Sequence, residues 1–209
     1  FSGFQTVQEG YTGVRTLFGR IYGAPGDEQL SPGPTLFWPY PVGEIVTVQV
    51  RRQVDLSKSF WPTYRRDDMT LEQATERADV TQPIRPGTND LGDGSLLTAD
   101  GDLVHVRITA EYTVDNAVDF LHNVNPATID NIVRMALRRG MVQTAASYTL
   151  TELIELREEP VAMLRANAQA MLDRQLGGRD REVAGVGART GVELTDVQIT
   201  ARTAPLAIR

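Results

Sequence analysis

The stretch at residues 103–114, LVHVRITAEYTV, has the clearest strand pattern in this chain. Apolar and polar residues alternate along it, which predicts a β-strand with one buried face and one wet face. The expected buried face comprises Val104, Val106, Ile108, Ala110, Tyr112 and Val114. The expected solvent face comprises His105, Arg107, Thr109, Glu111 and Thr113.

After this strand, the spacing of apolar residues along the sequence changes to that of a helix. Asn125-Pro126 predicts an N-cap followed by a proline at the first helical position. Gly140 either ends this helix or lies within it, and Arg138-Arg139 is interpreted as part of its solvated face. The apolar stripe of the helix consists of Ile129, Ile132, Val133, Ala136, Leu137 and Met141.

Two more helices are expected downstream. Thr149 with Glu152 three residues later predicts a capping box at a helix start. Pro160 disrupts a helix interior, so we expect a break near residues 157–159 and a new helix with Pro160 in its first turn. The apolar residues expected to line this last helix, before Gly177-Gly178 ends it, are Met163, Leu164, Ala168, Met171 and Leu172.

Further strands are predicted at residues 4–21, 44–54 and 191–202. A change of phase near Thr195-Asp196 predicts a bulge in the last of these. The order of strands, a long connection, a strand, helices and a final strand indicates an α+β fold. The residues expected to be buried in the first segment are Phe4, Val7, Val14, Leu17 and Phe18.

The long connection, residues 55–95, is interpreted as an insertion, because structureless links of this length are unusual inside a compact domain. Phe60, Trp61 and Tyr64 are aromatic anchors of the kind that interfaces favour, which makes this segment a hypothetical interaction surface. An excursion that packs on its own domain accounts for the same residues equally well.

The composition excludes several classes of protein. The formal net charge of -6 argues against nucleic-acid binding, which depends on clustered cations. The chain contains no cysteine, so disulfides and thiolate chemistry are excluded. No apolar run approaches the roughly 18–20 residues of a membrane span. Because the chain opens at Phe1 without an initiator methionine, we expect it to be a piece of a longer protein.

A search for chemistry yields no catalytic, cofactor-binding or metal-binding residues. His105 has no carboxylate or second histidine at ligand spacing, and His122 lies just before a predicted helix, so structural roles account better for both. The glycine-rich run 185–191 lacks the spacing and lysine of a phosphate loop. Ser57-Lys58 is rejected as a dyad because adjacent side chains on an extended segment point apart. We therefore predict that the chain is not an enzyme; a soluble hydrolase that uses carboxylates or Ser57 is a remote alternative.

Several separated segments of the chain carry motifs that point to one protein family. They include the pairs Gly13-Val14 and Phe18-Gly19 near the start and the proline- and glycine-containing run LSPGPTLFWP at 30–39. Further segments are LTADGDLVHV at 97–106, YTVDN at 112–116, ALR at 136–138 and YTLTEL at 148–153. Together these segments resemble the SPFH domain, or Band 7, family of stomatin, prohibitin, flotillin and the HflK and HflC proteins. Pro34 and Thr35 depart from the family's pattern.

The resemblance implies mixed or antiparallel sheets with helices packed on one side. It divides the chain into a membrane-proximal β part at 1–54, the insertion at 55–95 and an α/β part at 96–205. A transmembrane anchor and a C-terminal coiled coil are expected outside these residues. The opening Ser2-Gly3-Phe4 resembles the HflK-like branch, whereas the long insertion and Ala204-Pro205 depart from the common pattern.

The function implied by the resemblance is that of a non-catalytic, single-pass scaffold in a bacterial inner membrane. Such proteins form rings or cages as homo-oligomers, or as hetero-oligomers with an HflC-like paralogue, and regulate a membrane-bound AAA protease of the FtsH type. A stomatin- or flotillin-like organiser of membrane microdomains without a protease partner is the alternative. Membrane lipids are the other expected partner, and no cofactor is expected.

The run SPGPTLFWPYPVG at 31–43 places three aromatic residues among several prolines. Leu36 and Phe37 are expected to pack in the core of the first segment. Trp38 and Tyr40 have amphipathic rings. Rings of this kind are enriched at headgroup level in membrane proteins. The hypothetical membrane-facing residues are therefore Phe37, Trp38 and Tyr40.

Overall fold

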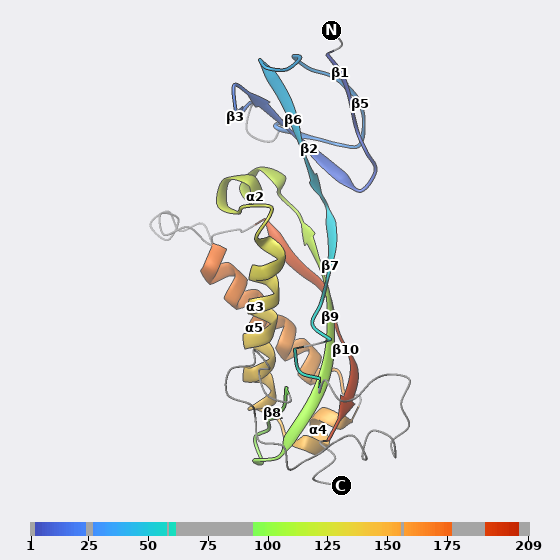
Figure 1. Ribbon diagram of the computed structural model, residues 1–209, viewed down its shortest axis with the longest axis vertical. Coiled ribbons are helices and arrows are strands. Elements are labelled where there is room, and N and C mark those ends of the chain that lie inside the picture. The colour runs from blue at the N-terminus through green and yellow to red at the C-terminus, as the bar shows by residue number, and fades with distance from the viewer. Residues whose placement is uncertain are drawn as a thin grey trace, which may run out of the picture. The chain divides into compact units, whose positions relative to one another are not determined.

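The computed structural model describes residues 3–23, 27–57, 59–61, 94–155, 157–176 and 191–204 (Figure 1). Within these ranges the chain is α+β, as predicted. The strands are β1 (Phe4–Val7), β2 (Tyr11–Leu17), β3 (Arg20–Ile21), β4 (Gln29–Leu30), β5 (Gly33–Leu36), β6 (Gly43–Gln49), β7 (Arg51–Asp55), β8 (Leu96–Leu97), β9 (Leu103–Val114) and β10 (Val192–Thr203). The helices are α2 (Ala117–Asn123), α3 (Ile129–Ala145), α4 (Leu150–Ile154) and α5 (Glu159–Leu176).

The chain divides into two compact units, each built from three separated pieces of sequence. Several elements, including β9 and α3, contribute residues to both units. Unit 1 comprises Phe1–Gln53, Glu111–Ile132 and Leu172–Thr195, and unit 2 comprises Val54–Ala110, Val133–Met171 and Asp196–Arg209. The boundaries expected from sequence, 1–54, 55–95 and 96–205, stay a prediction.

The first part of unit 1 is built around β2. This strand pairs antiparallel with β6 along its whole length, from Tyr11 opposite Gln49 to Leu17 opposite Gly43, and it also pairs with β3 and β4. A separate two-stranded sheet joins β1 to β5. Gly13 permits close packing here, because a Cβ at this position would lie 2.8 Å from the side chain of Val7. The buried apolar residues of this part are Val7, Val14 and Val48.

A second sheet has the strand order β10-β9-β7, with β8 paired to β9. The amide of Val114 donates to the carbonyl of Val50, and the amide of Leu56 donates to the carbonyl of Ile108. These bonds show that β7 and β9 run in opposite directions. The predicted buried face of β9 is confirmed for all of its members: Val104, Val106, Ile108, Ala110, Tyr112 and Val114.

The opposite face of β9 is not the wet face that the alternation predicts. His105 is only 1% exposed, and Thr113 is also buried. On this face the centroid of the Trp61 ring lies 4.3 Å from the Arg107 guanidinium. At the edge of the strand, the amide of Val106 donates to the carbonyl of Phe60. Residues 60 and 61 therefore pack along β9, which the sequence pattern of a single strand does not reveal.

The structure confirms some of the predicted helix starts and corrects others. Thr149 and Glu152 form the predicted capping box of α4, and Pro160 lies in the first turn of α5. The regular helix α3 begins at Ile129 and not at Pro126, because the Asn125 side chain accepts from the Ala127 amide in a preceding turn. Helix α2 is absent from the sequence-based expectations, although Asn116 caps it by accepting from the amides of Val118 and Asp119.

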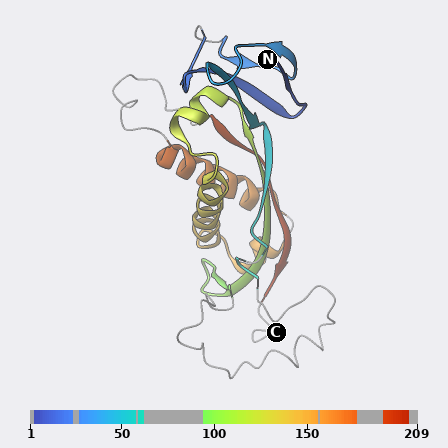
Figure 2. The same cartoon turned by 45° about the horizontal axis from the view of Figure 1, so that its top comes forward.

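Helices α3 and α5 lie side by side, on the same side of β9, in both views (Figures 1 and 2). Gly140 lies within α3, where a Cβ would be 3.1 Å from the backbone nitrogen of Ala168. Close by, the hydroxyl of Thr144 donates to the Gly140 carbonyl and accepts from the side-chain amide of Asn167. Small and polar residues therefore let the two helices approach closely in unit 2.

Candidate membrane and partner surfaces

Unit 1 exposes large apolar side chains around β1, β5 and the β2–β3 turn. This set, here called the apolar surface, comprises Phe4, Phe18, Tyr22, Leu36, Trp38 and Tyr40. Three of these positions correct the sequence-based expectations, because Phe4, Phe18 and Leu36 are exposed and were expected in the core. The predicted membrane-facing residues Trp38 and Tyr40 are 61% and 81% exposed.

Backbone and ring contacts bring the segments of the apolar surface together. Phe4 lies opposite Leu36 in the β1–β5 pair, and the Phe37 amide donates to the carbonyl of Gly3 at 2.8 Å. The half-exposed Phe37 ring lies 6.3 Å from the Tyr22 ring. The Phe18 amide donates to the carbonyl of Val42. Segments 3–4, 18–22 and 36–42 are therefore neighbours in the fold.

Phe18 is the most unusual member of this surface. It adopts a φ of 49° in the turn between β2 and β3, and Gly19 beside it has a φ of 76°. A bulky residue at positive φ is strained by about 1–3 kcal/mol, and Asn-Gly is the favoured sequence for such a turn. The Phe18 ring is 74% exposed, so packing within this part of the chain does not offset the strain.

The turn that carries Trp38 and Tyr40 is held by the backbone. The Val42 amide donates to the carbonyl of Pro39 at 3.1 Å. Gly43 lies against this turn, where a Cβ would be 2.8 Å from both the Phe37 ring and the Cβ of Trp38. A side chain at position 43 would therefore displace the segment that presents the exposed rings.

The hypothetical interaction residues of the insertion lie in unit 2. Phe60 is buried, Trp61 is half-buried, and Tyr64 lies outside the described residues. Gly94 meets Phe60 and Trp61, because a Cβ at Gly94 would lie 3.0 Å from the Trp61 nitrogen. Residues 60–61 and 94, which are far apart in sequence, thus contact one another and are here called the stem. Whether the insertion is an interaction surface stays a prediction.

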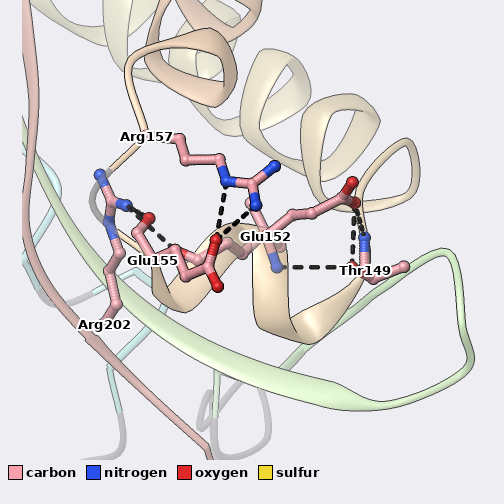
Figure 3. A network of polar contacts seen from close by, with 6 residues as sticks. Thr149, Glu152, Glu155, Arg157 and Arg202 are labelled. Atoms are coloured by element: carbon pink, nitrogen blue, oxygen red, sulfur yellow. Dashed lines mark hydrogen bonds and ion pairs between the residues drawn. The ribbon is translucent and has the colours of Figure 1, made fainter.

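A polar network fixes both ends of α4 in unit 2 (Figure 3). At its start, the Thr149 amide donates to the Glu152 carboxylate at 2.9 Å, and this bond lowers the pKa of Glu152. That contribution to stability is present above the unfolded-state pKa and is lost as the pH falls. At its end, Arg202 donates to the carbonyl oxygens of Leu153 and Glu155, at 3.0 and 2.7 Å. These bonds give partners to backbone groups at the two ends of α4 that have none within the helix, so the network stabilises the structure of this unit.

The candidate chemical groups do not converge. The Ser57 hydroxyl donates to the Asp55 carboxylate at 2.9 Å, whereas Lys58 lies outside the described residues. His105 lies in β9 and His122 in α2. Within the described ranges, no group of three or more His, Cys, Asp or Glu residues is placed to hold a metal ion. Among the helices that the structure describes, none is long and apolar enough to cross a membrane.

A comparison of the chain with models of known protein families gives a match that spans nearly its whole length. The match covers residues 5–209 and carries the description SPFH domain / Band 7 family. The chain belongs to the SPFH domain / Band 7 family. A comparison with curated proteins finds no match.

Family membership confirms the predicted fold class, an SPFH domain with antiparallel sheets and a few helices. It also suggests a membrane scaffold role, since SPFH proteins are generally membrane-associated and generally non-catalytic. The apolar surface of unit 1 is the feature of this SPFH domain that fits membrane association best, because exposed Trp and Tyr rings are typical of membrane interfaces.

Proposed function

We propose that this SPFH protein is a membrane-anchored scaffold whose apolar surface rests against the lipid headgroups. The observation that carries this proposal is Phe18, a large ring that is both strained and 74% exposed. A side chain that the fold does not bury, at a position where Asn or Gly would be less strained, is best accounted for by a contact outside this domain.

The composition of the apolar surface favours a bilayer as that contact. Trp38 and Tyr40 combine an apolar ring with a polar group, and such residues partition to the boundary between headgroups and acyl chains. Phe4 and Leu36 are purely apolar and extend the same surface through the β1–β5 pair. Transfer of such side chains from water stabilises the bound state by roughly 25 cal/mol per Å² of apolar area.

Flotation with neutral phosphatidylcholine vesicles tests this contact. The Trp38→Ala/Tyr40→Ala variant is expected to lower the partition coefficient of the chain by about tenfold or more. Leu97→Ala is the matched control, because Leu97 on β8 in unit 2 is 61% exposed, as is Trp38. Equal partitioning of the aromatic variant and the unaltered chain would remove the membrane contact and leave the family assignment intact.

At the finer level, we infer an HflK-like scaffold in a bacterial inner membrane that is anchored by a single span. It assembles into a ring or cage, alone or with an HflC-like paralogue, and restrains an FtsH-type AAA protease. The ordered SPFH motifs and the opening Ser2-Gly3-Phe4 support this branch. The full-length gene is then expected to encode an apolar span before Phe1 and a heptad-rich helix after Arg209.

Affinity purification of the full-length protein from its own membranes distinguishes the protease regulator from a microdomain organiser. Recovery of an AAA protease together with an SPFH paralogue supports the regulator. Recovery of large homo-oligomers without a protease favours the organiser, in which lipids and further copies of the chain are the main partners. A full-length sequence with a cleaved signal peptide and neither anchor nor coiled coil would contradict the regulator.

A further inference from the structure

A cavity lies in unit 2, and none of its lining residues belongs to the apolar surface. Its volume is about 460 Å³, within the range of pockets that hold small ligands. The residues that define its chemistry are Ser59, Phe60, Arg138, Arg139, Val142 and Met171. They come from the stem and the residue before it, from α3 and from α5, so three separated segments form one concave surface.

The wall of this cavity is apolar. Phe60 is buried and Met171 half-buried, but Val142 is 51% exposed on the face of α3 that lines the cavity. The close approach of α3 to α5 at Gly140 and Ala168 fixes the position of this wall. The wall therefore offers a preformed apolar surface that remains accessible to solvent.

Two arginines lie beside this wall. Arg138 and Arg139 are both exposed, and neither forms an ion pair within the part of the chain that the structure describes. The Nε of Arg138 donates to the Ser59 hydroxyl at 3.1 Å, which restrains the guanidinium and leaves its terminal nitrogens available. In a chain with a net charge of -6, two adjacent cations beside an apolar pocket favour an anionic ligand there.

We propose that this cavity binds a single-chain amphiphilic carboxylate, such as a medium-chain fatty acid. The carboxylate pairs with Arg138 and Arg139, because guanidinium groups bind carboxylates through two parallel hydrogen bonds. The aliphatic chain lies over Phe60, Val142 and Met171. This assignment is independent of the proposed scaffold function, since no residue of the apolar surface takes part.

The dimensions of the cavity favour this ligand over a larger acidic partner. Two guanidiniums match one carboxylate head, whereas recognition of phosphorylated or acidic macromolecules depends on larger clusters of cations. A volume of about 460 Å³ holds one short aliphatic chain rather than a protein segment. Gln143 also lines the cavity, and its side-chain amide is a hydrogen-bond donor that suits a carboxylate acceptor.

Isothermal titration of the whole chain with dodecanoate, below its micelle concentration, tests the proposal. Saturable one-to-one binding is expected, with no saturation by acetate and about tenfold weaker binding of dodecyltrimethylammonium. The acetate arm tests the apolar wall, and the cationic amphiphile tests the arginines. Absence of saturable dodecanoate binding, or equal affinity for the cationic amphiphile, would overturn the assignment.

Variants locate the binding. Arg138→Gln/Arg139→Gln is expected to weaken dodecanoate binding by about tenfold or more, and Val142→Asn by a few-fold. Arg174→Gln, an exposed arginine of α5 outside the cavity, is the control and leaves the affinity unchanged. All these side chains are exposed, so circular dichroism and thermal melting should show unchanged folding.

Two further arms distinguish the cavity from binding elsewhere on the chain and from a different ligand. Trp38→Ala/Tyr40→Ala should retain full dodecanoate affinity, even if it loses vesicle binding, so the two proposals fail independently. Dodecanoate binding that disappears in this aromatic variant would place the ligand on the apolar surface and overturn the cavity proposal. An acidic amphipathic peptide that binds more tightly than dodecanoate, with the same dependence on Arg138 and Arg139, would overturn the choice of ligand.

Discussion

The β1–β5 sheet and the β10-β9-β7 sheet both carry large apolar side chains, but they bury them to different extents. On β9, the apolar side chains from Val104 to Val114 are buried. On β1 and β5, the paired Phe4 and Leu36 are 57% and 79% exposed. Helices lie on one side of β9 in unit 2 (Figure 1), whereas Phe4 and Leu36 lie next to a turn that exposes Trp38 and Tyr40.

The difference shows that alternation and burial are separate properties. Period-two patterning determines which side chains share a face, because successive residues of a strand point to opposite sides. It does not determine whether another layer covers that face. In an isolated domain, a large uncovered apolar face marks a surface with a partner.

The largest difference in the free energy of unfolding is expected between two leucines of unit 1, one on a strand of each sheet. Leu194→Ala on β10 should lower the free energy of unfolding by about 2–5 kcal/mol, because Leu194 is fully buried. Leu36→Ala on β5 should change it by less than about 0.5 kcal/mol. Denaturant titration of both variants measures the difference. A comparable loss in both would mean that the β1–β5 sheet has a hidden core, and the contrast between the sheets would fail.

An intermediate effect is expected from two tyrosines. Tyr112 on β9 donates to the Asp130 carboxylate at 2.6 Å, so Tyr112→Phe should cost about 1–2 kcal/mol. Tyr40→Phe, at an exposed ring, should cost nothing measurable. Chemical unfolding at neutral pH compares the two variants, and an equal loss in both would contradict the role of the buried bond.

The same tyrosine predicts a dependence on alkaline pH. Burial and the bond to Asp130 raise the pKa of Tyr112 above its ordinary value of about 10. Its contribution to stability is therefore complete below pH 10 and declines as the pH rises above that value. Unfolding free energies measured from pH 9 to 11 should fall less steeply for Tyr112→Phe than for the unaltered chain. Identical slopes would show that Tyr112 does not couple folding to protonation.

The smallest effect is expected from two neighbouring arginines of β7. Arg52 contacts Asp130 at 3.3 Å and is about one-third exposed, whereas Arg51 contacts Glu111 at 3.6 Å and is largely exposed. Arg52→Gln should cost about 0.5–1 kcal/mol and Arg51→Gln close to zero. Thermal melts at low salt and at about 1 M salt check this, since screening should reduce the Arg52 effect. A larger loss for Arg51→Gln would contradict the dependence on burial.

The parts of the fold that could be predicted from sequence rest on local chemistry. The capping box of Thr149 and Glu152, Pro160 in a first helical turn and the buried face of β9 each follow from adjacent residues. Helix α2 escaped prediction, although Asn116 followed by Asp119 carries a capping signal. The burial of His105 depends on tertiary contacts along β9, which no local pattern encodes.

The candidate sites divide in the same way. The exposure of Trp38 and Tyr40 agrees with their sequence-based assignment as membrane-facing residues, and the membrane contact itself stays a prediction. The expectation for Phe18 is wrong, because a phenylalanine in a strand-like run predicts burial and its positive φ is invisible before the backbone is known. In the sequence, Arg138-Arg139 has the pattern of a solvated helix face. The cavity beside these arginines could not be predicted, because Phe60 and Met171, which complete it, are far from them in sequence.

The stem has a consequence for how the chain tolerates change in length. Because Gly94 meets Phe60 and Trp61 directly, the chain is at position 94 back at the place it occupies at position 61. The entropy of joining two points of a chain grows only with the logarithm of the number of residues between them, about 0.6 kcal/mol for each doubling. By this closure entropy alone, the number of residues between positions 61 and 94 changes stability little as long as the stem contacts are kept. Excision of Leu56 or Phe60, which are buried, would instead remove part of the core of unit 2.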